Sequence, residues 1–379
     1  MSGILTIGIV LPDWFEKKSL REAFKKLIEN PIIREVSIFR NAQKEPINSE
    51  RIKQFSHTIR GFRPDIDIAV DHEGGLVQRL RGEGFSSLPK PGDLRQLYQS
   101  GQEAYAQEIA KACGIVTAYE LGQVGINILY GPVFDTYNSD SAVIGKIGRS
   151  YGNPPVSTAL LKNYLSGLNG CLYTIVKHFP DHGQVTNDTH LDVAIDTRNK
   201  EDICTQSLPP YKELIYDGLM IAHVIYNNVD SLPATLSKKT VEFFVDKLAN
   251  SSKPIFSDAL EMKALTPIAP TIKERVKRCL ESGCDAILYC GGGGKPESDY
   301  LDKLHELIKF IEEKKQAEPT FRQRYQAAEE KINQLFKRKL NSLPTEKEYN
   351  DAKKIIDTFL IRYCKASAEM TTSTPTIRK

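Results

Sequence analysis

The sequence of 379 residues lacks any apolar run close to the ~20 residues that a membrane-spanning helix needs. It also lacks a long basic run, and its formal net charge is only +3, so neither nucleic acid nor a membrane surface is an expected partner. Residues 1–14 are apolar but have no basic start and no small-residue cleavage site, which favours a first strand over a signal peptide. These absences, with a hydrophobic fraction of 40%, are typical of an ordinary globular protein.

Cysteine is present but lacks the patterns that would give it a structural role. The seven cysteines are Cys113, Cys171, Cys204, Cys279, Cys284, Cys290 and Cys364. Their odd number and the absence of a CxxC spacing favour thiols in a reducing compartment over a disulfide framework. The close group Cys279, Cys284 and Cys290 matches no common zinc spacing. We therefore expect a cytoplasmic protein.

Short apolar, β-branched runs alternate with amphipathic segments along most of the chain. Eight of these runs are predicted as strands: Ile4–Val10, Val36–Phe39, Ile66–Val70, Ile126–Leu129, Tyr173–Val176, Leu219–Ala222, Pro254–Phe256 and Ala286–Tyr289. The alternation indicates a parallel sheet, because parallel neighbours need a crossover helix. Eight such units favour the α/β class and a single (β/α)8 TIM-type barrel with a C-terminal helical extension. An open doubly wound sheet is the competing architecture.

The chain after Tyr289 has the spacing of helices rather than of strands. Leu304, Leu307 and Ile311 follow helical periodicity, and a later helix is predicted over Glu348–Tyr363. The predicted organisation is a barrel over residues 1–315, helices packed on the barrel over residues 316–365, and a disordered tail over residues 366–379.

Polar and charged residues follow the predicted strands at their carboxyl ends. Asp71-His72-Glu73 follows the third run, Asp135 the fourth, Lys177-His178 the fifth, His223 the sixth and Asp258 the seventh. Because a barrel opens all these strand ends onto one face, the side chains would converge there. Polar residues that begin loops would explain one or two of these positions, but not a series dominated by Asp, His and Lys. This face is therefore the candidate site.

The segment from Lys177 to His190 is especially rich in titratable residues. His178, His182 and His190 lie within thirteen positions, which suggests a metal site. Pro180 makes a continuous helix through His178 and His182 unfavourable, so the two would not share a helical face as in an HExxH zinc site. Loop histidines can still bind zinc, so a metal-dependent hydrolase stays open as an alternative.

Five segments, in order along the chain, carry a family resemblance. They are DHEGGLVQRL; GINILYGPVFDTYNSDSAVIG with GRSYG; KHFPDHG with NDTH; MIAHVIYNNVD with PATLS; and FSDALEMKAL. Together they closely resemble the β-N-acetylglucosaminidases of glycoside hydrolase family three, the NagZ type, from about residue 4 to about residue 340. One such motif alone would be weak, but five at family-like separations are highly specific.

The resemblance implies roles for the residues that match the family motifs. Asp258 would be the nucleophile, and His190 would be the acid/base with Asp188 orienting it. An imidazole, with an ordinary pKa of ~6.5, can donate and then accept a proton near neutral pH. The residues that would bind the sugar are Asp71, Arg79, Arg149, Lys177 and His178, with His182 and His223 as nearby site residues.

The chain departs from the family pattern at several positions. The link over residues 144–148 is longer than usual and could displace Arg149. Asp181 stands where a glycine is usual, and this adds a carboxylate to the loop. Ala259 replaces a common second aspartate, although Asp258 itself is retained.

The resemblance implies hydrolysis of terminal, non-reducing β-linked N-acetylglucosamine by double displacement, with no metal or organic cofactor. The implied substrate is a muropeptide fragment, N-acetylglucosaminyl-anhydro-N-acetylmuramic acid, in cell-wall recycling in a bacterial cytoplasm. A monomer or a homodimer is expected. Three alternatives remain: a phosphorylase with the same nucleophile, a metal-dependent hydrolase built on His178, His182 and His190, and a non-catalytic sugar-binding barrel.

Overall fold

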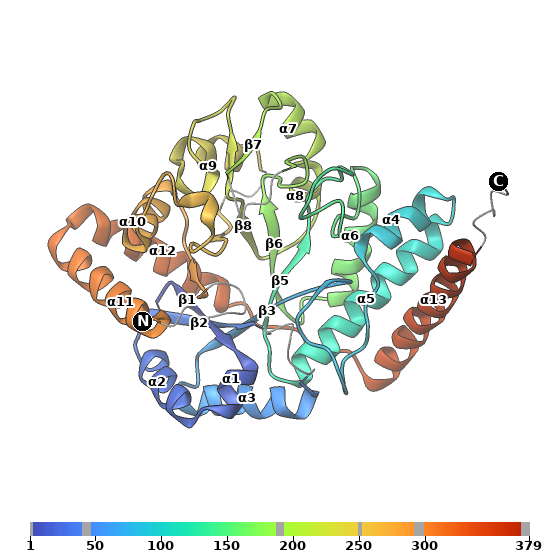
Figure 1. Ribbon diagram of the computed structural model, residues 1–379, viewed down its shortest axis with the longest axis horizontal. Helices are drawn as coiled ribbons and strands as arrows, with labels where there is room; N and C mark the ends of the chain where they lie inside the picture. The colour runs from blue at the N-terminus through green and yellow to red at the C-terminus, as the bar shows by residue number, and fades with distance from the viewer. Residues whose placement is uncertain (1–2, 40–46, 187–192, 249–251, 292–298, 373–379) are drawn as a thin grey trace, which may run out of the picture.

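The computed structural model describes residues 3–39, 47–186, 193–248, 252–291 and 299–372, with a strand barrel at the centre and helices around it (Figure 1). The barrel strands are β1 (Leu5–Val10), β2 (Ile33–Phe39), β3 (Asp67–Gly74), β5 (Ile128–Val133), β6 (Tyr173–Phe179), β8 (Gly218–Ile221), β10 (Ile255–Ser257) and β11 (Ile287–Tyr289). They are parallel and lie in the order β10-β8-β6-β5-β3-β2-β1-β11, and a bridge between Phe256 and Ala286 joins the two end strands. The predicted barrel is confirmed, and each predicted strand is present.

The helices of the described residues alternate with these strands and then continue beyond them. They are α1 (Leu11–Glu16), α2 (Lys18–Ile28), α3 (Ser49–Phe62), α4 (Pro91–Gln99), α5 (Glu103–Gln123), α6 (Val156–Leu168), α7 (Lys200–Gln206), α8 (Pro209–Glu213), α9 (Lys238–Val245), α10 (Ile272–Ser282), α11 (Tyr300–Ala317), α12 (Pro319–Phe336) and α13 (Glu346–Thr372). Within the described ranges, no helix combines the length and the apolar character needed to cross a membrane.

Three short strands lie outside the barrel. The strand β4 (Val77–Gln78) pairs with the end of β3, while β7 (Ala194–Asp196) and β9 (Val224–Tyr226) form a separate parallel pair. All three lie in connections that leave the carboxyl ends of barrel strands, and they therefore shape the face where the candidate site was expected.

Alternate residues of a barrel strand belong to two different apolar clusters. In β3, Ile68 and Val70 pack with the surrounding helices, whereas Ala69 packs in the interior cluster. In β5, Leu129 belongs to the outer cluster and Tyr130 to the interior one. This is the alternation expected of a strand with both faces buried. Apolar side chains from the end of α12 join the interior cluster, so this helix covers one end of the barrel.

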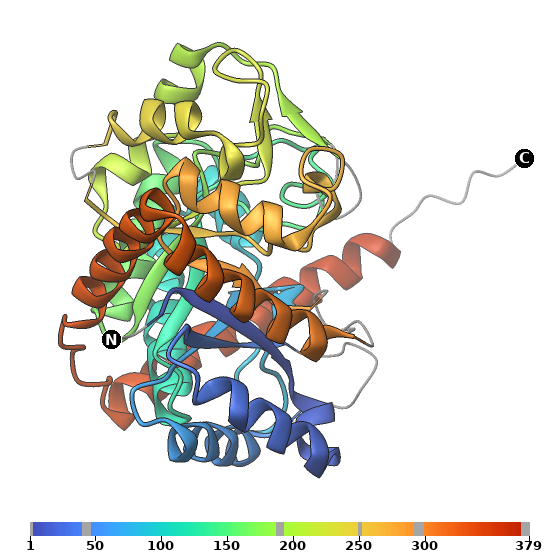
Figure 2. The same cartoon turned by 90° about the vertical axis from the view of Figure 1, so that its left-hand side faces the viewer.

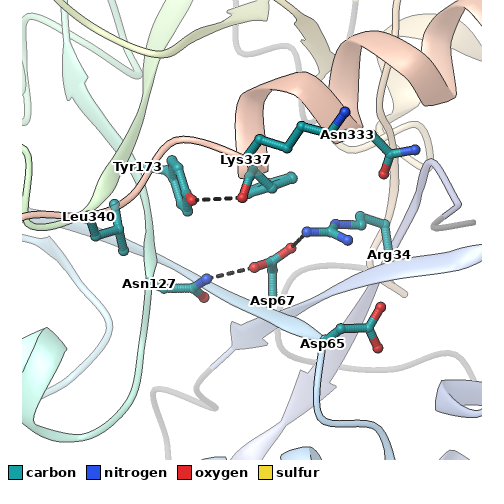
Figure 3. Close-up of a pocket in the computed structure, with 9 residues that line it drawn as sticks. Arg34, Asp65, Asp67, Asn127, Tyr173, Asn333, Lys337 and Leu340 are labelled. Carbon is teal, nitrogen blue, oxygen red and sulfur yellow. Dashed lines mark hydrogen bonds and ion pairs between the residues drawn. The ribbon is translucent and has the colours of Figure 1, made fainter.

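Hydrogen bonds and a cation–ring contact join the chain at the end of α12 to the amino ends of the barrel strands (Figure 3). The Tyr173 hydroxyl donates to the carbonyl oxygens of Phe336 and Arg338, at 3.2 and 2.6 Å. The Arg34 guanidinium lies 4.2 Å from the centre of the Phe336 ring and forms an ion pair with Asp67. These groups border a cavity of about 600 Å³. Because their charges are paired with each other, we assign this end of the barrel a structural role.

The last helix, α13, lies along α5 and then projects past the barrel (Figures 1 and 2). The Tyr349 ring stacks on the Tyr119 ring, with centroids 4.3 Å apart and planes 15° apart. The helix extends to Thr372, into the region 366–379 where a disordered tail was predicted. Residues 373–379 lie outside the described residues.

Candidate active site

The carboxyl ends of the barrel strands surround a cavity of about 720 Å³, a volume suited to a small ligand. The predicted site residues that line it are Asp71, Arg79, Arg149, Lys177, His178 and Asp258. They come from β3, from β6 and from the connections after β4, β5 and β10, so the barrel brings together residues that are distant in sequence. The predicted acid/base residues Asp188 and His190 lie outside the described residues.

Five alternating charges form what we call the charge ladder: Arg149, Glu73, Lys177, Asp71 and Arg79. Arg149 donates to both carboxylate oxygens of Glu73, from Nε at 2.7 Å and from Nη2 at 2.8 Å. Lys177 Nζ lies 2.7 Å from Glu73 and also bonds Asp71. Asp71 lies 3.5 Å from Arg79 Nη2. The ladder therefore links three side chains from β3 and β6 to two arginines from separate loops.

Burial and charge act in opposite directions on the pKa values of the ladder. Burial alone would raise the pKa of Glu73, but Arg149 and Lys177 hold it below its usual range. Burial likewise opposes the lowering of the Asp71 pKa by Lys177 and Arg79, and the lowering prevails. The two carboxylates raise the pKa of Lys177 against its burial. Both carboxylates and Lys177 are therefore charged at neutral pH, and charged partners form stronger hydrogen bonds with hydroxyls than neutral ones do.

The longer link before Arg149 does not displace its side chain from the cavity. The extra residues fold into tight turns, in which Lys146 N donates to Ser141 O at 2.9 Å and Arg149 N to Ile144 O at 3.0 Å. Gly148 has a φ of 74°, which favours glycine, and its carbonyl accepts from Gly92 N at 2.9 Å. The insertion is absorbed by these turns, and Arg149 still reaches the cavity.

His178 is oriented by Asp135, which follows β5. The buried Asp135 carboxylate lies 2.6 Å from His178 Nδ1 and also accepts from the main-chain N–H groups of His178 and His182, at 3.1 and 2.7 Å. The His182 ring is buried behind His178, with centroids 5.6 Å apart. Burial, and then His178, lower the pKa of His182 to about 4, so its imidazole is neutral at neutral pH. His182 thus packs against a cavity residue rather than lining the cavity itself.

Asp258 follows β10 and lines the cavity. The backbone of the next residue, Ala259, is held by hydrogen bonds at both its N–H and its carbonyl oxygen. Asp258 Oδ1 accepts from Ala259 N at 2.7 Å. His223 Nε2 lies 3.0 Å from Ala259 O, and because a carbonyl only accepts, that nitrogen carries the hydrogen. The other ring nitrogen of His223 lies 2.6 Å from Thr235 Oγ1. His223 is fully buried, so it supports the backbone next to Asp258 from behind.

Three residues of the site were given no role from the sequence. In the sequence, Glu73 and Asp135 are only polar residues that follow strands, and Glu261 is only part of its motif. Glu261 lines the cavity, and its two carboxylate oxygens accept from Cys290 N at 3.1 and 3.2 Å. One signal was available for Glu73: it lies two residues after Asp71 on one strand, so both side chains point to the same face.

The metal alternative rested on His178, His182 and His190. In the part of the chain that the structure describes, no group of three or more His, Cys, Asp or Glu side chains is arranged to hold a metal ion. His178 Nδ1 is already bound to Asp135, which leaves one ring nitrogen of that residue for another partner. His190 lies outside the described residues, so the complete trio is not described.

Comparison with known proteins identifies relatives over most of the chain. The model of the glycosyl hydrolase family 3 N terminal domain matches residues 9–327. A beta-hexosaminidase from Shewanella frigidimarina is 38% identical over 249 residues, which cover 64% of this chain and 71% of the relative. A beta-hexosaminidase from Hydrogenovibrio crunogenus is 34% identical over 293 residues, which cover 76% of this chain and 79% of the relative.

Solved structures share the barrel. Native NagZ from Neisseria gonorrhoeae is 28% identical and superposes with a TM-score of 0.65, covering 88% of this chain and 98% of its own. The same protein is also solved in complex with zinc ion, with the same TM-score and coverage. A family 3 β-N-acetylglucosaminidase from Paenibacillus sp. shares the fold at a TM-score of 0.73 and 23% identity, covering 93% of this chain and 66% of its own.

Proposed function

The chain belongs to glycoside hydrolase family 3, and from this membership we propose that it is a retaining exo-acting β-N-acetylglucosaminidase. The relatives named beta-hexosaminidase support this substrate class. The observation that carries the proposal is that Asp258 shares one cavity with the charge ladder. A retaining enzyme needs a nucleophile beside the anomeric carbon of a sugar held by its hydroxyls, and a carboxylate beside charged hydrogen-bonding groups supports that assignment.

The first step forms a covalent glycosyl-enzyme. The Asp258 carboxylate bonds to the anomeric carbon while the bond from that carbon to the leaving oxygen breaks. Protonated His190 gives its proton to the leaving oxygen, so the leaving group departs as a neutral alcohol. Asp188 holds the His190 tautomer and balances its positive charge.

The second step hydrolyses the glycosyl ester. His190, now neutral, accepts a proton from water while the water oxygen attacks the anomeric carbon. N-acetylglucosamine is released with its β configuration retained, and both the Asp258 carboxylate and protonated His190 are regenerated. The ladder residues Asp71, Lys177 and Arg149 hold the sugar hydroxyls through both steps, with His178 beside them.

The finer assignment concerns the natural substrate and its place in the cell. We propose a muropeptide fragment that carries a terminal N-acetylglucosamine, acted on in the cytoplasm of a bacterium during cell-wall recycling. The five motifs shared with the NagZ type support this assignment. The similarity to NagZ from Neisseria gonorrhoeae over 88% of the chain supports it as well.

The test is release of nitrophenol from 4-nitrophenyl β-N-acetylglucosaminide by the wild type and by Asp258→Asn. We expect activity in the wild type and a loss of about 10⁴-fold or more in the variant, since the covalent step needs the carboxylate. Activity that survives Asp258→Asn would contradict the assignment of the nucleophile.

Two additions to the same assay, together with a binding measurement, separate the three alternatives. Activity that requires phosphate and yields N-acetylglucosamine 1-phosphate would identify a phosphorylase. Activity that EDTA abolishes and zinc restores would identify a metal-dependent hydrolase. Binding of N-acetylglucosamine without turnover of either the nitrophenyl glycoside or a muropeptide would identify a non-catalytic sugar-binding barrel.

A further inference from the structure

Lys263 is the one exposed residue in the described wall of the cavity that contains Asp258. The other described residues of this wall are buried or half-buried. Side chains of the barrel interior, among them Tyr130, Met220 and Leu288, close the floor of the cavity. Lys263 therefore lies at the mouth, where the wall meets solvent. The mechanism above gives it no role.

The connection after β10 holds the backbone of Lys263 in a defined place. Lys263 begins the short 3-10 helix η2 (Lys263–Leu265), on the same connection as the proposed nucleophile. Arg275 of α10 is buried behind this connection and donates to the carbonyl oxygens of Leu260 at 2.6 Å and Ala269 at 2.7 Å. These bonds hold the connection on both sides of η2. The lysine side chain therefore extends from a fixed point of the wall.

The order of the barrel strands sets the direction in which a bound sugar lies. In this order β3 and β10 are four strands apart either way around the barrel, so Asp71 and Asp258 lie on opposite sides of the cavity. A sugar whose hydroxyls bind the charge ladder therefore has its anomeric carbon on the β10 side. The nucleophile and the leaving oxygen lie on opposite faces of that carbon. Because the floor is closed, the leaving group extends toward the mouth, on the side where Lys263 lies.

The charges of the β10 connection bear on which leaving groups bind there. Two carboxylates of this connection, Asp258 and Glu261, line the cavity. Both would repel a negatively charged leaving group, and Lys263 is the cation of the same connection that can offset the repulsion. Among the described residues no carboxylate forms an ion pair with Lys263, so its charge is available to a ligand.

We propose that Lys263 is a specificity-determining residue that binds a carboxylate on the leaving group. The inference rests on the proposed function and narrows its substrate class, because β-N-acetylglucosaminides with an anionic leaving group are then preferred over neutral ones. The lactyl carboxylate of N-acetylmuramic acid is the simplest such group. The flexible stem of a lysine suits this role, since it lets the ammonium group follow a carboxylate at the mouth.

Two disaccharides that differ by a single charge isolate this contact. One is β-1,4-linked N-acetylglucosaminyl-N-acetylmuramic acid, and the other is the primary amide of its lactyl carboxyl group. The wild type should have a higher kcat/KM for the acid than for the amide. Lys263→Met should lower the acid-to-amide ratio of kcat/KM about two- to fivefold, the size expected of one exposed ion pair. Lys263→Glu should lower it about tenfold or more, because it adds repulsion to the lost attraction. Lys263→Arg, which keeps the charge, should preserve the preference for the acid.

Salt and a matched variant provide the controls. Raising the NaCl concentration from roughly 0.02 M to about 0.5 M should bring the wild-type ratio toward that of Lys263→Met, since salt screens exposed charges. The matched variant is Lys239→Met. Lys239 is an exposed lysine of α9 that does not line the cavity, so its loss changes the net charge of the molecule by the same amount. Its acid-to-amide ratio should equal that of the wild type.

The outcomes separate this inference from the function beneath it. If the wild type releases N-acetylglucosamine from neither disaccharide nor from the nitrophenyl glycoside, the proposed function fails and the inference fails with it. If both disaccharides are hydrolysed and Lys263→Met leaves their ratio unchanged, the role of Lys263 alone is overturned. Equal losses on both substrates in Lys263→Met, or an equal change of the ratio in Lys239→Met, overturn it as well.

Discussion

At the scale of single residues, Glu73 illustrates how a site depends on a side chain that does not line the cavity. Its carboxylate is buried, with a side-chain exposure of 1%, and bonds two cations that do line the cavity, Arg149 and Lys177. Both Glu73 oxygens accept from Arg149, and Val143 O accepts from its Nη1 at 3.0 Å, so the planar guanidinium of Arg149 is held in one orientation. Glu73 therefore sets the direction in which these two cations face a sugar, although Glu73 itself does not line the cavity.

Glu73→Gln tests this dependence. We expect KM for 4-nitrophenyl β-N-acetylglucosaminide to rise about tenfold or more, because the amide keeps one acceptor and loses the charge that orients Arg149. The unfolding free energy should fall by about 3 kcal/mol, the cost of leaving buried cations without their partner. Steady-state kinetics and urea unfolding measure the two effects.

Asp285→Asn is the control for Glu73→Gln. Asp285 is also fully buried and also binds two cations, Arg324 and Lys331, at 2.9 and 3.2 Å. It should lose a similar unfolding free energy and keep the wild-type KM. An unchanged KM in Glu73→Gln, or an equal rise in both variants, would contradict the orienting role of Glu73.

At the scale of elements, α5 and α6 cross at a contact that only glycine permits. A Cβ at Gly114 of α5 would lie 2.1 Å from Tyr164 O, and a Cβ at Gly167 of α6 would lie 2.1 Å from Lys111 O. Both clashes involve main-chain oxygens, which a side-chain rotation cannot relieve. Because the cavity residues between β5 and β6 lie on the connection that leads into α6, the crossing of α6 with α5 also supports the wall that carries Arg149.

Replacing a glycine by alanine should change the unfolding free energy in opposite directions in α5 and in α3. Gly114→Ala is expected to lower the unfolding free energy by about 2 kcal/mol, because overpacking outweighs the ~1 kcal/mol gained in helix propensity. Gly61→Ala in α3, where a Cβ meets nothing within 4 Å, should raise it by about 0.5–1 kcal/mol. Thermal and urea unfolding of both variants would show this; a stabilised Gly114→Ala would mean that the two helices can separate without cost.

At the scale of the whole molecule, the barrel interior contains a carboxyl group between its two ends. Tyr130 lines the cavity and donates its hydroxyl hydrogen to Glu35, which is fully buried. Burial, with a smaller contribution from Asp67, raises the pKa of Glu35 from 4.5 to about 8, against the lowering effect of the hydrogen bond from Tyr130. Glu35 is therefore protonated at neutral pH.

This protonation links global stability to pH. Between pH 4.5 and pH 8 the folded protein holds the Glu35 proton and the unfolded chain does not, so the unfolding free energy falls as pH rises. Glu35→Gln removes this contribution. From pH 5 to pH 7, urea unfolding should show the wild type losing about 2–3 kcal/mol more than the variant. Glu83→Gln, at an exposed glutamate, is the control, and equal pH dependence in wild type and Glu35→Gln would refute the assignment.

The sequence predicted the barrel well because its strands repeat a local signal, an apolar run followed by a polar residue and a helix. It did not predict β7 or β9, since three residues such as Ala194–Asp196 become a strand only through a distant partner. The charge ladder also depends on distant partners and could not be predicted from the sequence. Glu73 lies in a recognisable motif, but its bond to Arg149 joins residues that are 76 positions apart. The predicted roles of Asp188 and His190 stay predictions, since those residues lie outside the described part of the chain.

Closure of the barrel has a consequence for how the chain is made on the ribosome. One edge of β1 pairs with β2, but its other edge pairs with β11, at Leu5–Ile287, Thr6–Leu288 and Ile7–Tyr289. At roughly 5–20 residues per second, the first strand waits on the order of tens of seconds for that partner to be translated. A nascent strand with an open edge is prone to pair with other chains. One edge of β1 is therefore open to pairing with other chains during synthesis, until the last barrel strand has been made.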